Sequence, residues 1–251
     1  MTDAAARYAY SDATPHKQDG LRLTVQKHAS ICAAIYAKHS WARQPYVFVD
    51  MNAGPGIDPD GNPGSPLVVA DVLSSFLFQW RILAFERDAV TFSELVTACA
   101  GRPQVLTFNE DHADMLDRLS NALHPDKGYG MIYHDPSNAP GVNVELMRSA
   151  AARFPKVDLL INLACASYKR TVDHPGYVPI EDVLAGIGKN VWLIRRPAHK
   201  FQWSMFLGTN YNRYREYSDF ARLDSQEGRE ILRTVSMTKR EAAADVQPAL
   251  L

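Results

Sequence analysis

The sequence predicts an α/β fold: a three-layer, doubly wound sheet of seven strands, mostly parallel and with an antiparallel last strand. The first observation is a regular alternation of short apolar runs, rich in β-branched and aromatic residues, with longer segments of helical periodicity. Strands that alternate with helices in this way form βαβ units, which give a mostly parallel sheet covered on both faces. The second observation is that the last two apolar runs lie only a few residues apart. That spacing is too short for the crossover between parallel strands, so this pair is predicted to be antiparallel.

Each element is indicated by its own residues. The predicted strands are YVFVDM (46–51), RILAFE (81–86), QVLTFN (104–109), GMIYHD (130–135), VDLLINLA (157–164), NVWLIRR (190–196) and QWSMFLGTN (202–210). The predicted helices cover residues 21–40, 66–78, 89–100, 112–123, 142–154 and 180–187. The first helix is indicated by apolar residues at helical spacing, and Pro66 falls in the first turn of the second, where proline is tolerated.

Composition narrows the class of protein. The 251 residues include 27 Lys and Arg against 28 Asp and Glu, so the formal net charge is −1 and any polyanion site must be a local patch. Three scattered cysteines argue against a disulfide framework and a structural zinc site, and fit a reducing cytoplasm. No apolar stretch approaches the roughly 20 residues that span a bilayer, and the first ten residues lack the layout of a signal peptide. We therefore expect a cytoplasmic protein that binds no metal and no membrane.

The connection VDMNAGPGIDPDGNPGSPLVV (49–69) contains four glycines and four prolines. Glycine lets the backbone approach a ligand closely or adopt positive φ, and proline limits the freedom that glycine leaves. Asn52, Ala53, Gly54 and Gly56 come after the first strand, at the edge where open α/β sheets bind ligands. The loop is therefore predicted to cradle a nucleoside, with the IDPDGNPGSP excursion as a wall or lid. The plainer alternative is a long turn.

Acidic and amide side chains occur at the ends of the first three strands. Asp50 ends the first strand, and Glu86 ends the second with Asp88 close behind. A carboxylate at the second strand end is well placed to accept hydrogen bonds from two ribose hydroxyls, as in dinucleotide folds. In the NEDH stretch after the third strand, Asn109, Asp111 or the histidine could meet an adenine edge. The alternative for Glu86 is a helix N-cap or a partner of the helix dipole.

The glycine spacing favours a cofactor without phosphates. The NAD fingerprint G-x-G-x-x-G leads promptly into a helix, whereas Gly54 and Gly56 lack a third glycine at that spacing and the helix begins near Pro66. A P-loop needs G-x-x-x-x-G-K-[ST], and no such lysine is present. S-adenosylmethionine suits this loop better.

The fourth strand ends in HDPSNAP (134–140), where Asp135, Pro136, Ser137 and Asn138 form a candidate catalytic corner. An adenine amino group is a poor nucleophile because its lone pair is delocalised. A carboxylate and backbone carbonyls that accept its two N–H groups would concentrate electron density on the nitrogen, and proline removes a competing donor there. An ordinary Asp-Pro turn explains the spacing equally well.

The stretches QKHASI, YVFVDMNAGPG, DGNPGSPLVVA and the strand-end DP together resemble the three-Cys-motif partner protein family. More distantly, they resemble the bacterial ribosomal RNA adenine-N6 methyltransferases that pair a Lys-His helix with an AGxG loop and a PGSP segment. The resemblance covers residues 20–140 approximately, and DG-PGSP is its most specific element. It implies a class I S-adenosylmethionine-dependent methyltransferase fold, in which seven strands end in a hairpin.

By this resemblance Lys27 and His28 flank the cofactor, Asp50 and the glycine loop cradle it, and Glu86 binds its ribose. The expected cofactor-binding set is Lys27, His28, Asp50, Asn52, Ala53, Gly54, Gly56, Ser65, Glu86, Asn109 and Asp111.

One departure from the pattern bears on the substrate. Adenine-N6 methyltransferases usually carry D-P-P-[YFW], whose aromatic ring stacks on the target base, whereas this chain continues with Ser137 and Asn138. Tyr133, Tyr168 or Trp203 could supply the ring instead.

Basic and aromatic residues are interleaved near the last strands, in SYKR (167–170), RRPAHKFQW (195–203) and NYNRYREY (210–217). Such a local patch would bind the phosphates of a nucleic acid and hold a flipped base. The ordinary alternative is that Arg and Tyr cover apolar surface. The expected substrate-binding residues are Tyr168, Lys169, Arg170, Arg195, Arg196, Lys200 and Trp203.

These patterns support three functional hypotheses. The first is an S-adenosylmethionine-dependent methyltransferase acting on a nucleic-acid base, DNA or RNA, most simply at an adenine amino group. The second keeps the fold but performs another base modification. The third is a non-catalytic partner within a modification system. For the chain as a whole we expect an arm (1–20), a methyltransferase-like domain (21–228) and a peripheral C-terminal segment (229–251).

Overall fold

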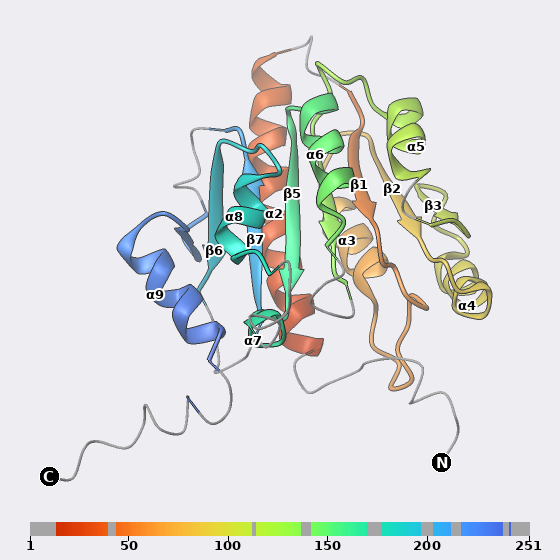
Figure 1. The fold of residues 1–251 in the computed structure, drawn as a ribbon. Helices are drawn as coiled ribbons and strands as arrows, with labels where there is room; N and C mark the ends of the chain where they lie inside the picture. The colour runs from red at the N-terminus through yellow and green to blue at the C-terminus, as the bar shows by residue number, and fades with distance from the viewer. Residues whose placement is uncertain are drawn as a thin grey trace, which may run out of the picture. The chain divides into compact units, whose positions relative to one another are not determined.

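The computed structural model describes residues 14–39, 44–111, 114–136, 142–169, 177–196, 203–211, 217–237 and 241. Its eight strands, parallel in one part of the chain and antiparallel in the other, alternate with helices and make an α/β protein (Figure 1). The chain divides into two compact units, residues 1–134 with 149–158, and residues 135–148 with 159–251. The expected division into arm, domain and C-terminal segment stays a prediction.

The elements keep the predicted alternation. In the first unit they are α2 (Thr14–Lys38), β1 (Tyr46–Asp50), α3 (Ser65–Leu73), β2 (Trp80–Phe85), α4 (Ala89–Cys99), β3 (Val105–Phe108), α5 (Met115–Ala122) and β4 (Gly130–His134). Two elements run from one unit into the other, α6 (Val144–Arg153) and β5 (Val157–Leu163). The second unit continues with α7 (Cys165–Lys169), α8 (Ile180–Ala185), β6 (Val191–Arg195), β7 (Ser204–Thr209), β8 (Phe220–Arg222) and α9 (Gln226–Val235).

The first unit holds four parallel strands in the order β3-β2-β1-β4. All five residues of β1 are buried, which explains why a continuous apolar run encodes this strand. In the register, Asp50 pairs with Ala84 of β2 and with Tyr133 of β4. The carboxyl ends of these three strands therefore meet at one edge, and the residues just beyond them are brought together there.

The second unit confirms the predicted hairpin. Strand β7 pairs antiparallel with both β5 and β6. Among the residues that the structure describes there are eight strands rather than the predicted seven, because β8 adds a further antiparallel pair to β6. This three-residue edge strand has no apolar run of its own, so strand periodicity could not indicate it.

The helix bounds differ from the expectation most at the start of α2 and at the end of α3. Helix α2 begins at Thr14 instead of at residue 21. Helix α3 ends at Leu73 instead of running to Phe78. The hydroxyls of Ser74 and Ser75 donate to the carbonyls of Ala70 and Val72, which satisfies carbonyls of the last turn.

Position 208 of β7 has no room for a side chain, because the ring of Trp192, its partner on β6, packs against the glycine. A Cβ at position 208 would lie 2.6 Å from the Trp192 Cη2 atom. We expect Gly208→Ala to lower the free energy of unfolding by about 1–3 kcal/mol, because the packed ring must move. Denaturant titration measures the change. Gly186→Ala is the control, since its added methyl comes no closer than 3.3 Å to any neighbour considered. Equal stability of the two variants would contradict this prediction.

Candidate cofactor site

The candidate site lies in the first unit, where β1 and β2 end and the glycine loop begins. Gly54 and Gly56 both adopt positive φ, +63° and +80°, a conformation that other residues rarely adopt. A Cβ at Gly56 would lie 2.8 Å from Ala98 Cβ, so this glycine allows the loop to pack on α4. A Cβ at Gly54 would meet no atom within 4 Å, so this glycine faces open space. Gly54 therefore has the property expected of a backbone that a ligand approaches.

The excursion after Gly56 closes on itself. Ile57 and Pro63 form an antiparallel bridge, and the Asp58 amide donates to the Asn62 carbonyl at 2.9 Å. The Gly64 amide then donates to the carbonyl of Gly56 at 2.7 Å. The chain thus returns to the start of the loop.

The return also places Ser65. This buried residue is the first of α3, and Pro66 comes next in the first turn as predicted. The wall or lid role of the excursion stays a prediction.

Glu86 connects the glycine loop that follows β1 with the residues that follow β2. Its Oε2 accepts the Gly54 amide at 3.1 Å, and its Oε1 accepts the Asp88 amide at 2.8 Å. The cap of α4 is Asp88, whose carboxylate accepts the Thr91 amide at 2.9 Å. The N-cap alternative for Glu86 is therefore wrong: Asp88 caps the helix, while Glu86 binds the glycine loop.

Asn109 and Asp111 lie just after β3. The Asn109 amide donates to the carbonyls of Glu86 and Arg87 at 2.9 and 3.1 Å, so it braces the end of β2. Asp111 lies 3.8 Å from the Arg87 guanidinium, and both side chains are exposed. The next residue, the histidine at position 112, lies outside the described residues.

Asp50 and Asn52 begin the loop. Asp50 is fully buried, and its Oδ1 accepts the Asn52 amide at 3.2 Å. The Asn52 side chain meets His134, with 2.8 Å between Oδ1 and Nδ1. Ala53 is buried and its amide donates to the Phe85 carbonyl, which ties the loop to β2.

The sequence prediction missed His134. This buried residue ends β4, and it reaches Asn52 because β4 is the neighbour of β1 in the sheet. Its position at a strand end next to a candidate corner was the available signal.

His28 lies elsewhere. Its Nδ1 is 2.7 Å from the Tyr46 hydroxyl, and its Nε2 is 3.3 Å from Asp158 Oδ2. Tyr46 opens β1, so His28 lies at the amino end of a strand whose carboxyl end leads into the glycine loop. These contacts give His28 a structural role, and the place beside the cofactor that the resemblance implies stays a prediction. Lys27 precedes it on α2 and is partly exposed.

We expect His28→Ala to destabilise the fold rather than weaken a ligand. The Asp158 side chain is only 8% exposed and would lose its imidazole partner, which should cost about 2–3 kcal/mol. Thermal unfolding measures this loss, with Ser30→Ala on the exposed face of the same helix as the control. An unchanged unfolding temperature together with weaker S-adenosylmethionine binding would instead support the role that the resemblance implies.

The predicted catalytic corner belongs to the second unit. The Asp135 Oδ1 accepts the side-chain amide of Asn162 on β5 at 2.8 Å. Pro136 comes next and is partly buried. Ser137 and Asn138 lie outside the described residues.

The basic patch is largely engaged in internal contacts. Lys169 lies 2.8 Å from Glu241, and Arg195 lies 3.3 Å from Asp219. The Tyr168 hydroxyl donates to the Val178 carbonyl. Trp203 is partly buried just before β7. Arg170 and Lys200 lie outside the described residues.

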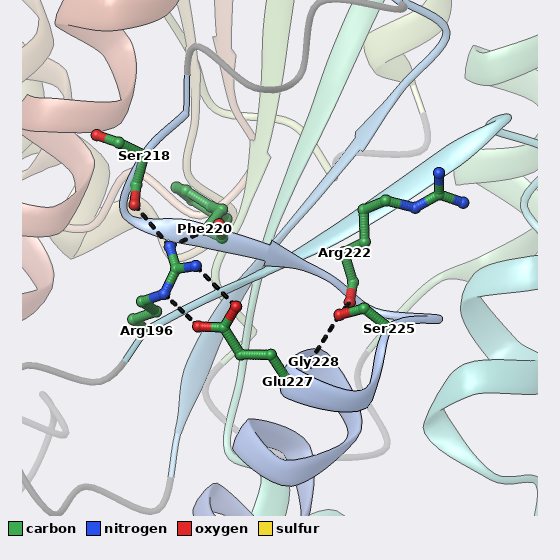
Figure 2. Close-up of polar contacts among 7 residues, drawn as sticks. All are labelled: Arg196, Ser218, Phe220, Arg222, Ser225, Glu227 and Gly228. Atoms are coloured by element: carbon green, nitrogen blue, oxygen red, sulfur yellow. Dashed lines mark hydrogen bonds and ion pairs between the residues drawn. The ribbon is translucent and has the colours of Figure 1, made fainter.

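Arg196 has a structural role (Figure 2). Its Nε and Nη2 donate to the two carboxylate oxygens of Glu227 at 2.6 and 2.9 Å. Its Nη1 donates to the carbonyls of Ser218 and Phe220 at 2.6 and 2.7 Å. One guanidinium thus ties the end of β6 to α9 and to the start of β8. Nothing in the sequence indicates the ion pair between Arg196 and Glu227, because the two residues are 31 positions apart in the chain.

The cysteines are buried free thiols. Burial, and next the charge of Asp158, raises the pKa of Cys32 well above its ordinary value. Burial raises the pKa of Cys165 to about 12 and also raises that of Cys99. Thiols in this state are poor nucleophiles.

The described residues lack two features, a metal-binding cluster and a membrane-spanning helix. Those residues contain no group of three or more His, Cys, Asp or Glu side chains that could hold a metal ion. Within the same ranges, no helix combines the length and apolar character needed to cross a membrane.

Comparison with known proteins gives a fold but no family. No family model matches the chain, and no curated protein matches it. A Legionella pneumophila protein of the DUF519 family is 16% identical, with a TM-score of 0.51 over 84% of this chain and 90% of that one. Methanococcus jannaschii fibrillarin, a pre-rRNA processing protein, is 19% identical, with a TM-score of 0.46 over 67% of each chain. Aeropyrum pernix fibrillarin, solved with natively bound S-adenosyl-L-methionine, is 13% identical, with a TM-score of 0.45 over 67% and 68%. The first likeness shows a shared α/β fold.

Proposed function

We propose that this chain is a class I S-adenosylmethionine-dependent methyltransferase that acts on a nucleic-acid base. The observation that carries the proposal is the contact between the Gly54 amide and the Glu86 carboxylate, 3.1 Å apart. It joins a glycine that faces open space to an acidic residue at the end of β2. A nucleoside fits this pair, because its ribose hydroxyls are donors for a carboxylate and its body can lie against bare backbone.

The charges at this edge of the first unit favour S-adenosylmethionine over a dinucleotide. Asp50 precedes the loop, and the Glu86 carboxylate accepts the Gly54 amide, so two carboxyl groups lie at the start of the loop. Carboxylates repel a pyrophosphate, whereas they attract the sulfonium and the ammonium of S-adenosylmethionine. Each carboxylate oxygen accepts more than one hydrogen bond, so Glu86 can bind both the loop amides and a ribose.

Glu86 and the loop from Asn52 to Gly56 would hold the cofactor, with Asp50 and His134 fixing the loop behind it. When bound, S-adenosylmethionine supplies a methyl group whose transfer forms a bond to the acceptor atom, breaks the carbon–sulfur bond and leaves that electron pair on sulfur. Asp135 would accept an N–H of the attacking amino group and take up the proton that the nitrogen releases. Most of the acceleration would come from positioning and electrostatic complementarity.

Adenine N6 is the acceptor atom that we propose, because a strand-end Asp-Pro suits an exocyclic amino group. No aromatic residue follows Pro136 in the D-P-P-[YFW] position, so another residue would have to supply the ring that stacks on the target base.

A second candidate function is a non-catalytic partner in a modification system. The observation that favours it is the internal pairing of Lys169, Arg195 and Arg196. These cations are engaged with carboxylates, so they attract phosphates less than the sequence patch predicts.

Transfer of a labelled methyl group distinguishes the methyltransferase from the non-catalytic partner. Purified protein is incubated with methyl-labelled S-adenosylmethionine and with RNA or DNA, and the label in each polymer is counted and located by nuclease digestion. Label in N6-methyladenosine or its deoxy form supports the proposal. Label in neither polymer, with a protein that still binds the cofactor, favours the partner hypothesis.

A further inference from the structure

Asn162 is a polar residue in an apolar strand. Every residue of β5 is buried, and its sequence is VDLLINL. Asn162 is 4% exposed and pairs with Met205 in the register with β7. A buried amide is costly unless it is hydrogen-bonded, so its partner indicates its role.

That partner is Asp135. The Asn162 Nδ2 donates to the Asp135 Oδ1 at 2.8 Å, and both residues belong to the second unit. Rotation about the bond to a carboxyl group is broad, so an unrestrained carboxylate samples many orientations. A hydrogen bond to one named oxygen fixes the plane of the group. Because the donor is a neutral amide, it orients the carboxylate without neutralising its charge.

The other end of the amide argues against a purely stabilising role. The Asn162 Oδ1 is buried and has no hydrogen-bond partner among the described residues. An amide whose oxygen is buried without a partner contributes less to stability than a fully hydrogen-bonded one, because the desolvation of that oxygen is not offset.

We propose that Asn162 is a positioning residue, which holds the Asp135 carboxylate in the orientation that accepts an N–H of the substrate amino group. This inference rests on the proposed function. Asn162 lies outside the Asp135-Pro136 corner, which is the part of the site that the sequence motif indicates.

Asn162→Leu removes the hydrogen bond and keeps the approximate volume. We expect kcat to fall by about 10- to 100-fold, as for a misplaced reacting group, while the Kd for S-adenosylmethionine stays at the wild-type value. We expect the KM for nucleic acid to change by less than about 2-fold, because binding contacts are kept. Met205→Leu, a substitution at the paired position of β7, is the matched control for repacking and should keep wild-type kcat.

Asn162→Asp tests the positioning role through the pH–rate profile, which a purely structural role of Asn162 would leave unchanged. Two carboxyl groups would then share one site, and the like charge disfavours ionisation of both. The acidic limb of the pH–rate profile should therefore move to higher pH by about 1 unit or more. If Asn162→Leu does not fold, the pH–rate profile of Asn162→Asp still tests the positioning role.

The outcomes separate the two proposals. Wild-type kcat in Asn162→Leu, or an acidic limb of Asn162→Asp at the wild-type pH, would overturn the positioning role and leave the proposed function standing. A wild-type protein that neither binds S-adenosylmethionine nor transfers a methyl group would overturn both.

Discussion

Glu86→Ala should raise the Kd for S-adenosylmethionine by about 100-fold or more, since hydrogen bonds to a charged group contribute about 1.5–3 kcal/mol each and two ribose hydroxyls lose theirs. The substitution also frees the amides of Gly54 and Asp88, so the loop would keep only the bond from the Ala53 amide to Phe85 as its described tie to β2. Isothermal titration with S-adenosylmethionine and S-adenosylhomocysteine measures the effect.

Two further variants define the cause of that loss. Glu86→Gln keeps an acceptor and loses the charge, and it should bind with intermediate affinity. Asp71→Asn removes a carboxylate of α3 that pairs with Arg102, and it should bind like the wild type. Wild-type affinity in Glu86→Ala would rule out this residue as the ribose ligand.

Asp135→Ala should lower kcat for methyl transfer by about 100- to 10,000-fold, the range expected when a residue that accepts the proton is removed. Affinity for S-adenosylmethionine should be unchanged, because Glu86 and the glycine loop carry it. Single-turnover methylation with saturating cofactor measures the chemical step.

Asp182→Asn, on α8 of the same unit, controls for the loss of a carboxylate. A fall in cofactor affinity that matches the fall in rate would assign Asp135 to binding instead. Unchanged kcat would show that HDPSNAP is an ordinary Asp-Pro turn.

The alternation of strands and helices could be predicted because each strand is built around a short apolar run. Strand β1 is the clearest case, since all of its residues are buried. The final hairpin was also predictable, because the short connection excludes a crossover. Strand β8 was not, since its three residues are held at an edge by contacts that include the Arg196 guanidinium.

In the site, residues placed by the ends of strands could be predicted, whereas contacts that depend on the order of strands in the sheet could not. Glu86 meets Gly54 as the topology of a doubly wound sheet requires. His134 meets Asn52 only because β1 and β4, which are far apart in sequence, are adjacent in the sheet.

Ion pairs are the other feature that the sequence hides. Lys169 and Glu241 are 72 residues apart, so a count of basic residues could not show that this cation is paired. His28 is a related case, because its partner Asp158 stands far along the chain at the start of β5.

Titration of the wild-type protein with S-adenosylmethionine, against NAD⁺ as the rival nucleotide, tests the central claim most directly. The cradle of Gly54 and Glu86 predicts micromolar binding of S-adenosylmethionine and its demethylated product, and no heat with NAD⁺. No heat with either methionine compound from a folded sample, or tighter binding of NAD⁺, would contradict the assignment of this site.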